Sequence, residues 1–119
     1  EVEQVLYPAL PDAPGHALWK RDFTGACGLF AVQLRPMAEQ AVTAMLDGMN
    51  LFGMGFSWGG FESLILLTNP GKDRTAKPWQ GRGPLLRLHI GLENPEDLIA
   101  DLEAGFERMR SELGAVCAK

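Results

Sequence analysis

The sequence predicts an α+β fold, in which a small, mainly antiparallel sheet carries helices packed on one face. Two stretches alternate apolar and polar residues with the period of a half-buried strand, and two others repeat apolar residues at the spacing of an amphipathic helix. The elements follow one another as strand, helix, two or three strands, helix, an order typical of an antiparallel sheet covered on one side. The other face of the sheet is therefore expected to be free to meet another surface.

The length of 119 residues suits one compact domain, and a hydrophobic fraction of 46% is that of a globular protein with a core. Residues 1–27 contain the turn-prone run PDAPG. We therefore expect an extended approach segment there, with at most one short strand near residues 5–7. We expect residues 28–119 to form the α+β domain itself.

The charge and the cysteines exclude several classes of partner and site. A net charge of -4 argues against nucleic acid as a partner, because phosphate contacts require clustered Lys and Arg. No apolar run approaches the roughly 20 residues that cross a membrane, and the first residues lack the pattern of a signal peptide. Cys27 and Cys117 have no metal-site spacing, so we expect reduced thiols and a cytoplasmic location.

The first half of the domain is predicted to run strand, helix, strand, strand. Residues 28–35 place an apolar side chain at every second position, which predicts a strand. Residues 38–49 follow the i, i+3, i+4, i+7 spacing of an amphipathic helix. A short strand is expected over 52–56, and the run SLILLT at 63–68 is expected to be a strand buried on both faces.

The second half is predicted to hold a loop, a strand and the last helix. Residues 69–84 are rich in Pro, Gly and charge, so we expect a long, mobile surface loop. Residues 85–92 alternate again. One face of this strand holds Leu86, Leu88 and Ile90, and the opposite face holds Arg87 and His89.

The last helix carries the clearest end signals. Asn94 is a plausible N-cap, Pro95 takes the first helical position, and Asp97 stands at the capping-box place. Gly114 is expected to stop the helix.

Arg87 is the charged residue that most invites a binding role, since its guanidinium can hold a carboxylate or phosphate with two hydrogen bonds. The alternative, favoured by spacing alone, is a solvated strand arginine or one paired with a surface Glu. For His89 a packed structural role is favoured over that of a base.

Ser57 lies in Gly55-Phe56-Ser57-Trp58-Gly59, which matches the GxSxG pattern of a hydrolase nucleophile. That pattern requires a helix after the serine, whereas a strand is predicted here, so we reject an esterase. Gly59 and Gly60 favour a backbone that another group approaches closely, or one that turns with positive φ. Trp58 is expected either to wall a pocket or to cover the core, and the sequence leaves both open.

Other catalytic signatures are missing from the sequence. It contains no phosphate-binding loop, no HExxH zinc motif and no EF-hand pattern. The lysines stand in polar or terminal contexts, which does not favour a Schiff-base lysine. The lysines are Lys20, Lys72, Lys77 and Lys119.

Four segments together resemble the C-terminal region of the cystathionine β-lyase group, within the Cys/Met-metabolism family of pyridoxal-phosphate enzymes. They are VEQVLYPALPDAPGH, KRDFTGACGLFAVQL, FSWGGFESL and RLHIGLENPEDLIADL, in the family's order and covering almost the entire chain. Trp58 after Ser57 is similar to bacterial β-lyases, since the related γ-synthases and γ-lyases usually carry a different residue there.

The resemblance implies that Arg87 binds the α-carboxylate of a sulfur amino-acid substrate, helped by Ser57, with Trp58 lining the pocket. The whole enzyme is expected to cleave cystathionine to homocysteine, pyruvate and ammonia and to form a homo-oligomer. The family's catalytic lysine and its phosphate-binding residues belong to an N-terminal domain for pyridoxal phosphate that these residues do not include. We therefore expect no catalytic or cofactor-binding residue in this chain, an inactive isolated chain, and an Arg87 face that is exposed or paired with another copy.

Two alternatives remain open at this point. In the first alternative, the chain is a stand-alone ligand-binding or interaction domain that keeps the carboxylate clamp without catalysis. In the second, it is part of a related cystathionine γ-lyase or γ-synthase.

Overall fold

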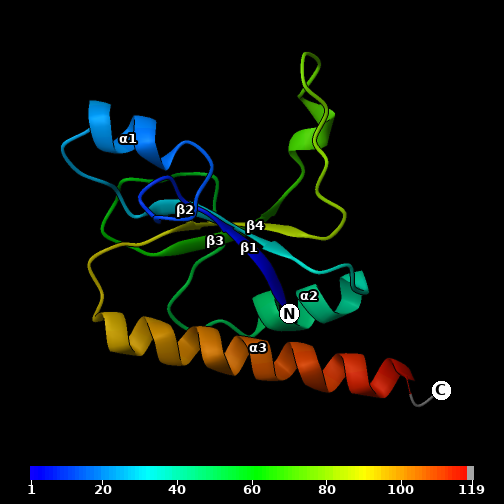
Figure 1. Cartoon of the computed structure of the whole chain (residues 1–119). Helices are drawn as coiled ribbons and strands as arrows, with labels where there is room; N and C mark the ends of the chain where they lie inside the picture. Colours follow the sequence, from blue (N-terminus) through cyan, green and yellow to red (C-terminus); the bar gives the residue numbers. More distant parts are fainter. Residues whose placement is uncertain (118–119) are drawn as a thin grey trace.

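A four-stranded antiparallel sheet forms the centre of the molecule (Figure 1). The computed structural model describes residues 1–117. The strands stand in the order β1-β2-β4-β3, and all three pairings are antiparallel, which confirms the predicted sheet. Their bounds are β1 Val2–Leu6, β2 Leu29–Leu34, β3 Leu64–Thr68 and β4 Leu85–His89.

The two helices α2 (Glu39–Asp47) and α3 (Pro95–Cys117) pack against each other and against one face of the sheet (Figure 1). The predicted alternation of β4 is confirmed, since Leu86 and Leu88 are buried in this layer. The helices approach closely at Gly105, where a Cβ would lie 2.9 Å from Met49 Sδ. The largest fully buried apolar side chains are Leu34, Met45, Ile65, Leu86, Met109 and Val42.

Helix α3 begins as predicted but ends later. The Asn94 side chain caps it, since Asn94 Oδ1 accepts a hydrogen bond of 2.9 Å from the Glu96 backbone N–H. The prediction that Gly114 stops the helix was wrong, because α3 continues to Cys117. Gly114 does not take the positive φ of a helix-ending glycine.

Residues 1–27 are more structured than predicted. Strand β1 pairs with β2, and α1 (His16–Asp22) is a short helix in a segment for which we expected at most a strand. Helix α1 buries no residue and has no side-chain cap, and its preceding residue Gly15 has φ +85°. These seven residues therefore carry neither of the sequence signals on which a helix prediction depends. The division into 1–27 and 28–119 stays a prediction.

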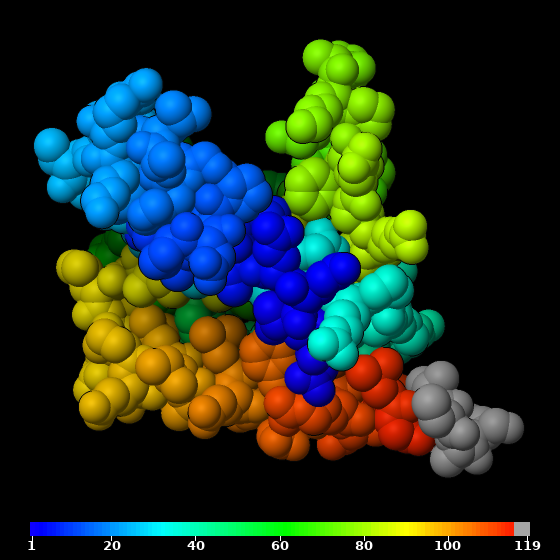
Figure 2. All heavy atoms as spheres, viewed as in Figure 1, coloured from blue at the N-terminus to red at the C-terminus, as the bar shows by residue number. Residues whose placement is uncertain are grey.

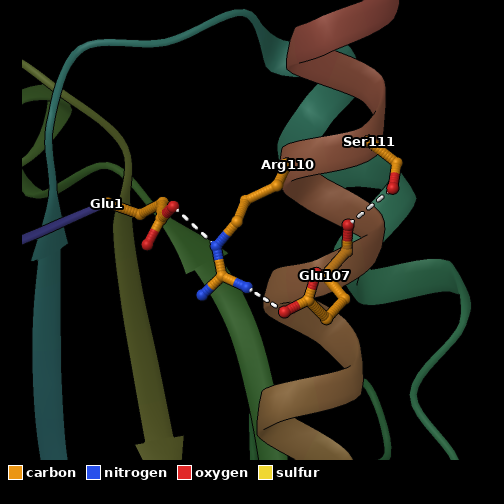
Figure 3. Close-up of polar contacts among 4 residues, drawn as sticks. All are labelled: Glu1, Glu107, Arg110 and Ser111. Atoms are coloured by element: carbon orange, nitrogen blue, oxygen red, sulfur yellow. Dashed lines mark hydrogen bonds and ion pairs between the residues drawn. The ribbon is translucent and has the colours of Figure 1, made fainter.

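Glu1 ties the edge strand β1 to helix α3 (Figure 3). The Arg110 guanidinium donates to the Glu1 carboxylate at 2.8 Å and also pairs with Glu107, one turn earlier on α3. This hydrogen bond from Arg110 lowers the pKa of the Glu1 carboxyl below its usual range. Because the Glu1 carbonyl also accepts from the Arg35 backbone N–H, the residue just before β1 is held through both its side chain and its backbone.

Two segments around the sheet differ from the sequence-based expectation. No strand forms over 52–56, where the chain makes only an isolated bridge between Gly53 and Leu64. Strand β3 lies at the edge of the sheet, so Leu67 is 42% exposed and the prediction of burial on both faces was wrong.

Two exposed segments project from the same side of the molecule, away from α3 (Figure 2). One is the predicted surface loop 69–84, which contains the short 3-10 helix η1 (Pro70–Lys72). The other carries α1. The mobility of the loop stays a prediction. Cys27 is an exposed free thiol, as predicted, whereas the Cys117 side chain and Lys119 lie outside the described part of the chain.

The buried carboxylate of Asp101 fixes the chain where it leaves α2. It is 6% exposed and accepts backbone N–H groups from Asn50 (3.0 Å), Leu51 (2.8 Å) and Phe52 (3.4 Å). Burial raises the pKa of Asp101, but the hydrogen bonds from these three residues outweigh burial and hold it below its usual range. The fold therefore stabilises the ionised form of the Asp101 carboxyl group.

We predict that Asp101→Asn lowers the free energy of unfolding by about 2 kcal/mol, because the amide cannot accept all of these hydrogen bonds. Urea unfolding at pH 7 measures the change. The control is Glu103→Gln, which alters an exposed carboxylate on the same helix and should change stability by less than about 0.5 kcal/mol.

The same pair of proteins tests the sign of the pKa shift. A lowered pKa stabilises the fold above the unfolded pKa of about 4, and this contribution is lost as the pH falls through the folded pKa. The difference between wild type and Asp101→Asn should therefore shrink as the pH falls from 5 towards 2. A difference that stays constant over this range would contradict the assignment.

Candidate functional site

The loop between α2 and β3, residues 53–63, lies over the face of the sheet opposite the helices. This face was expected to be free. The part of this face that carries Arg87 and His89 is instead covered by the loop, because both side chains form hydrogen bonds with the loop backbone. Buried residues stand at both ends of the loop, with Phe52 4% exposed and Ser63 0% exposed.

Arg87 points from β4 into the loop and donates from one nitrogen to three carbonyl oxygens. Its Nη2 lies 3.2 Å from Gly55 O, 2.8 Å from Phe56 O and 3.1 Å from Ser57 O. Its Nε is buried and has no hydrogen-bond partner. Arg87 forms no ion pair within the described residues, so a pairing with a surface Glu was not found. A half-buried cation without a counter-charge is available to an anionic ligand.

His89 is buried and contacts the same loop one step further along. Its exposed fraction is 6%, and Nε2 lies 3.1 Å from Gly60 O and 3.1 Å from Gly59 N. These contacts agree with the packed role favoured for it from the sequence. They do not involve Ser57, so the structure offers no Ser–His pair and the esterase remains rejected.

Ser57 and Trp58 stand on the turn where the contacts of Arg87 end and those of His89 begin. The Ser57 carbonyl is the last group bound by Arg87, and Gly59 is the first bound by His89. Both side chains are exposed, Trp58 by 63%, so Trp58 does not cover the core. Gly59 follows with φ +81°, a backbone conformation that side chains disfavour. The structure thus brings Arg87, Ser57 and Trp58 together, while their binding roles stay predictions.

Glu93 and Ser63 hold the far end of the loop and were not found from the sequence. The Ser63 backbone N–H and hydroxyl each donate to the Glu93 carboxylate at 2.7 Å, and Ser63 Oγ accepts from Gly91 N at 2.9 Å. The hydrogen bond from the Ser63 backbone lowers the pKa of Glu93 below its usual range. No motif marks this pair, because the two residues come from separate turns 30 residues apart.

The loop exposes large apolar side chains, and the site is open. Neither of the cavities of about 850 and 840 Å³ is lined by Arg87, Ser57 or Trp58. A closed binding site around Arg87 therefore requires a further surface. The exposed apolar residues of the loop are Met54, Phe56, Trp58 and Phe61.

Two kinds of feature, a metal-ligand cluster and a membrane-spanning helix, are absent from residues 1–117. The described residues hold no cluster of His, Cys, Asp and Glu suited to a metal ion. Among the helices that are described, none is long and apolar enough to span a membrane.

We predict that Ser63→Ala loosens the end of the loop, because it leaves the Gly91 backbone N–H without its acceptor and removes one hydrogen bond to Glu93. The expected loss of unfolding free energy is about 1–3 kcal/mol, measured by urea unfolding. Ser111→Ala is the matched control, since that hydroxyl binds only a carbonyl of its own exposed helix turn. Equal effects of the two changes would contradict the role given to Ser63.

None of the lysines within residues 1–117 forms a hydrogen bond with Arg87 or with the loop 53–63. Pyridoxal phosphate is held in enzymes through a lysine Schiff base, and no lysine takes part in the contacts around Arg87. Lys20 is exposed on α1, and Lys72 and Lys77 are exposed in the loop 69–84. The absence of a catalytic lysine from this chain stays a prediction.

The chain is similar in sequence and structure to known enzymes of sulfur amino-acid metabolism. A cystathionine beta-lyase of Bordetella avium is 51% identical over 91% of this chain, and one of Salmonella typhimurium is 50% identical over 92%. The chain spans only 27% and 29% of the lengths of these two relatives. A solved cystathionine gamma synthase from Xanthomonas oryzae, in complex with cystathionine, superposes with a TM-score of 0.75 at 38% identity, covering 92% of this chain and 30% of that one.

A family model also matches most of the chain. The family of Cys/Met metabolism PLP-dependent enzymes matches residues 1–107, which include every strand of the sheet and the candidate site. The resemblance noted from the four sequence segments is thereby confirmed, and the chain belongs to the family of Cys/Met metabolism PLP-dependent enzymes.

Proposed function

We propose that this chain is the C-terminal, substrate-binding domain of a PLP-dependent carbon–sulfur lyase that cleaves cystathionine to homocysteine, pyruvate and ammonia. Two relatives named cystathionine beta-lyase are 50% and 51% identical to it, against 38% for the gamma synthase. This difference favours the β-lyase over the γ-synthase alternative. In the domain, Arg87 holds the α-carboxylate of the sulfur amino acid.

The observation that carries this proposal is the buried, unpartnered Nε of Arg87. A buried N–H without an acceptor is costly, so its persistence needs an explanation. A carboxylate bound side-on to Arg87 takes both Nε and Nη2. Its charge-assisted hydrogen bonds are stronger than those to neutral carbonyls, so it displaces the Gly55, Phe56 and Ser57 oxygens from Nη2.

Ser57 and Trp58 complete the proposed site. Their side chains are exposed on the turn that touches Arg87. The Ser57 hydroxyl is then free to donate to the bound carboxylate, and the Trp58 ring is free to wall the substrate. Both residues act in binding, and neither is assigned a catalytic step.

The rest of a longer protein supplies what this chain lacks. The matched relatives are more than three times as long as the chain, and we propose that the remainder holds the cofactor and covers the apolar side chains of the loop 53–63. A homo-oligomer and a cytoplasmic location, with Cys27 reduced, are part of the same proposal.

We predict that Arg87→Ala in the full-length enzyme raises KM for cystathionine and lowers kcat/KM on the order of 30- to 4000-fold. This factor corresponds to a loss of about 2–5 kcal/mol of transition-state stabilisation. The reason is the loss of the charge that pairs with the carboxylate. Arg87→Lys keeps the charge without the two-pronged geometry and should recover only part of the loss. Steady-state kinetics measures both.

The matched control for this prediction is Arg110→Ala, which removes an arginine of a surface ion pair on α3 and should leave KM unchanged. An unchanged kcat/KM in Arg87→Ala would end the assignment. Retained binding of cystathionine by the isolated chain, with no turnover by any longer form, would favour the stand-alone binding domain.

We predict that the isolated chain binds more of a hydrophobic dye per molecule than the full-length enzyme does, because Phe56 and Phe61 are 86% and 70% exposed in the chain alone. The double change Phe56→Ser, Phe61→Ser should lower dye binding by the chain and leave that of the full-length enzyme unaltered. The control Leu92→Ser removes an equally exposed apolar residue outside the loop. Equal dye binding by chain and enzyme would contradict a covered loop.

A further inference from the structure

Two side chains of one strand hold the turn that carries Ser57 and Trp58. Arg87 and His89 are two positions apart on β4, so they point to the same face of the sheet. Arg87 binds carbonyls before the turn, ending at Ser57 O, and His89 binds the backbone after it, at Gly59 and Gly60. The side chains proposed to contact the substrate, Ser57 and Trp58, therefore stand at the last Arg87 contact and directly before the first His89 contact.

The contacts of His89 select one form of its ring. With the proton on Nε2, the ring donates to Gly60 O at 3.1 Å, while the Gly59 N–H, 3.1 Å from Nε2 and 3.4 Å from Nδ1, packs against the ring. With the proton on Nδ1, the ring accepts from Gly59 but has no donor for Gly60 O. A ring with a proton on Nε2 is therefore the form that donates to Gly60 O while it contacts Gly59.

The two attachments are not equivalent once a ligand is present. If a carboxylate displaces the loop carbonyls from Arg87, the turn loses its contacts with that side chain. The contacts of His89 are with Gly59 and Gly60 and do not compete with the carboxylate. His89 itself is buried, with 6% of its surface exposed, so its side chain is fixed by the surrounding packing. His89 is then the side chain that keeps the turn in place while Arg87 changes partners.

We propose that His89 is a positioning residue, whose imidazole fixes the Ser57–Trp58 turn beside Arg87 and so sets the affinity for the amino-acid substrate. The part of this inference that concerns the substrate rests on the proposed function. The part that concerns the turn rests only on the contacts of this chain. His89 touches neither substrate nor reacting atoms, so it acts through the turn.

The first test uses the 119-residue chain and nuclear magnetic resonance. Correlation spectra of the imidazole nitrogens should show His89 with its proton on Nε2, and a ring with the proton on Nδ1 would overturn the proposal. In His89→Leu, which keeps the volume without the polar atoms, exchange of the Gly59 amide with water should become about tenfold faster. His89→Gln retains a donor and an acceptor and should stay close to wild type.

The matched control is His16→Leu, which changes the other histidine of the chain and should not alter exchange at Gly59. Exchange of amides in β2 and β4 reports whether each variant folds. Should His89→Leu not fold, His89→Gln and the tautomer of the unmodified chain still decide the question. A Gly59 amide that exchanges at the wild-type rate in folded His89→Leu would overturn the proposal.

The second test uses the full-length enzyme. His89→Leu should raise KM for the amino-acid substrate by about tenfold with a smaller effect on kcat, and His89→Gln should stay within about threefold of wild type. An equal loss in both variants would show that only packing matters and would overturn the substrate part. If Arg87→Ala leaves KM unchanged, the proposed function fails, and the Gly59 measurement still decides whether His89 holds the turn.

Discussion

The candidate site depends on two carboxylates that accept backbone N–H groups at the two ends of one loop. Asp101 of α3 binds the chain as it leaves α2, and Glu93, just before α3, binds the chain at Ser63 as it enters β3. A loop without its own secondary structure is otherwise free to move. Because both anchors belong to α3 or the turn before it, the helix layer determines where the loop lies across the sheet.

Strand β4 connects the core to this loop through its alternation. Leu86 and Leu88 face α2 and α3 and are buried, so the strand cannot rotate without exposing them. The same constraint turns Arg87 and His89 to the other face, where both meet the loop backbone. The apolar core therefore sets the direction of the arginine on which the proposed carboxylate site depends.

The exposed apolar side chains of the loop over Arg87 agree with the proposal that this domain shares its site with other parts of a longer protein. Aromatic side chains of the loop are exposed, and Arg87, Ser57 and Trp58 line neither of the cavities of about 850 and 840 Å³. The lengths of the relatives, more than three times that of this chain, leave ample polypeptide to cover this face. In the proposed function, the chain contributes binding and positioning, and the remainder of the protein holds the cofactor.

The sequence by itself determined the elements that bury an apolar face, since periodicity and end signals depend on neighbours along the chain. It predicted the amphipathic helix α2, the alternation of β4 and the Asn94 cap. It did not predict α1, which buries nothing, or the end of α3 beyond Gly114. Only the tertiary structure decided that Asp101 and Glu93 bind distant backbone and that the loop covers Arg87, because these contacts join residues about 30 to 50 positions apart.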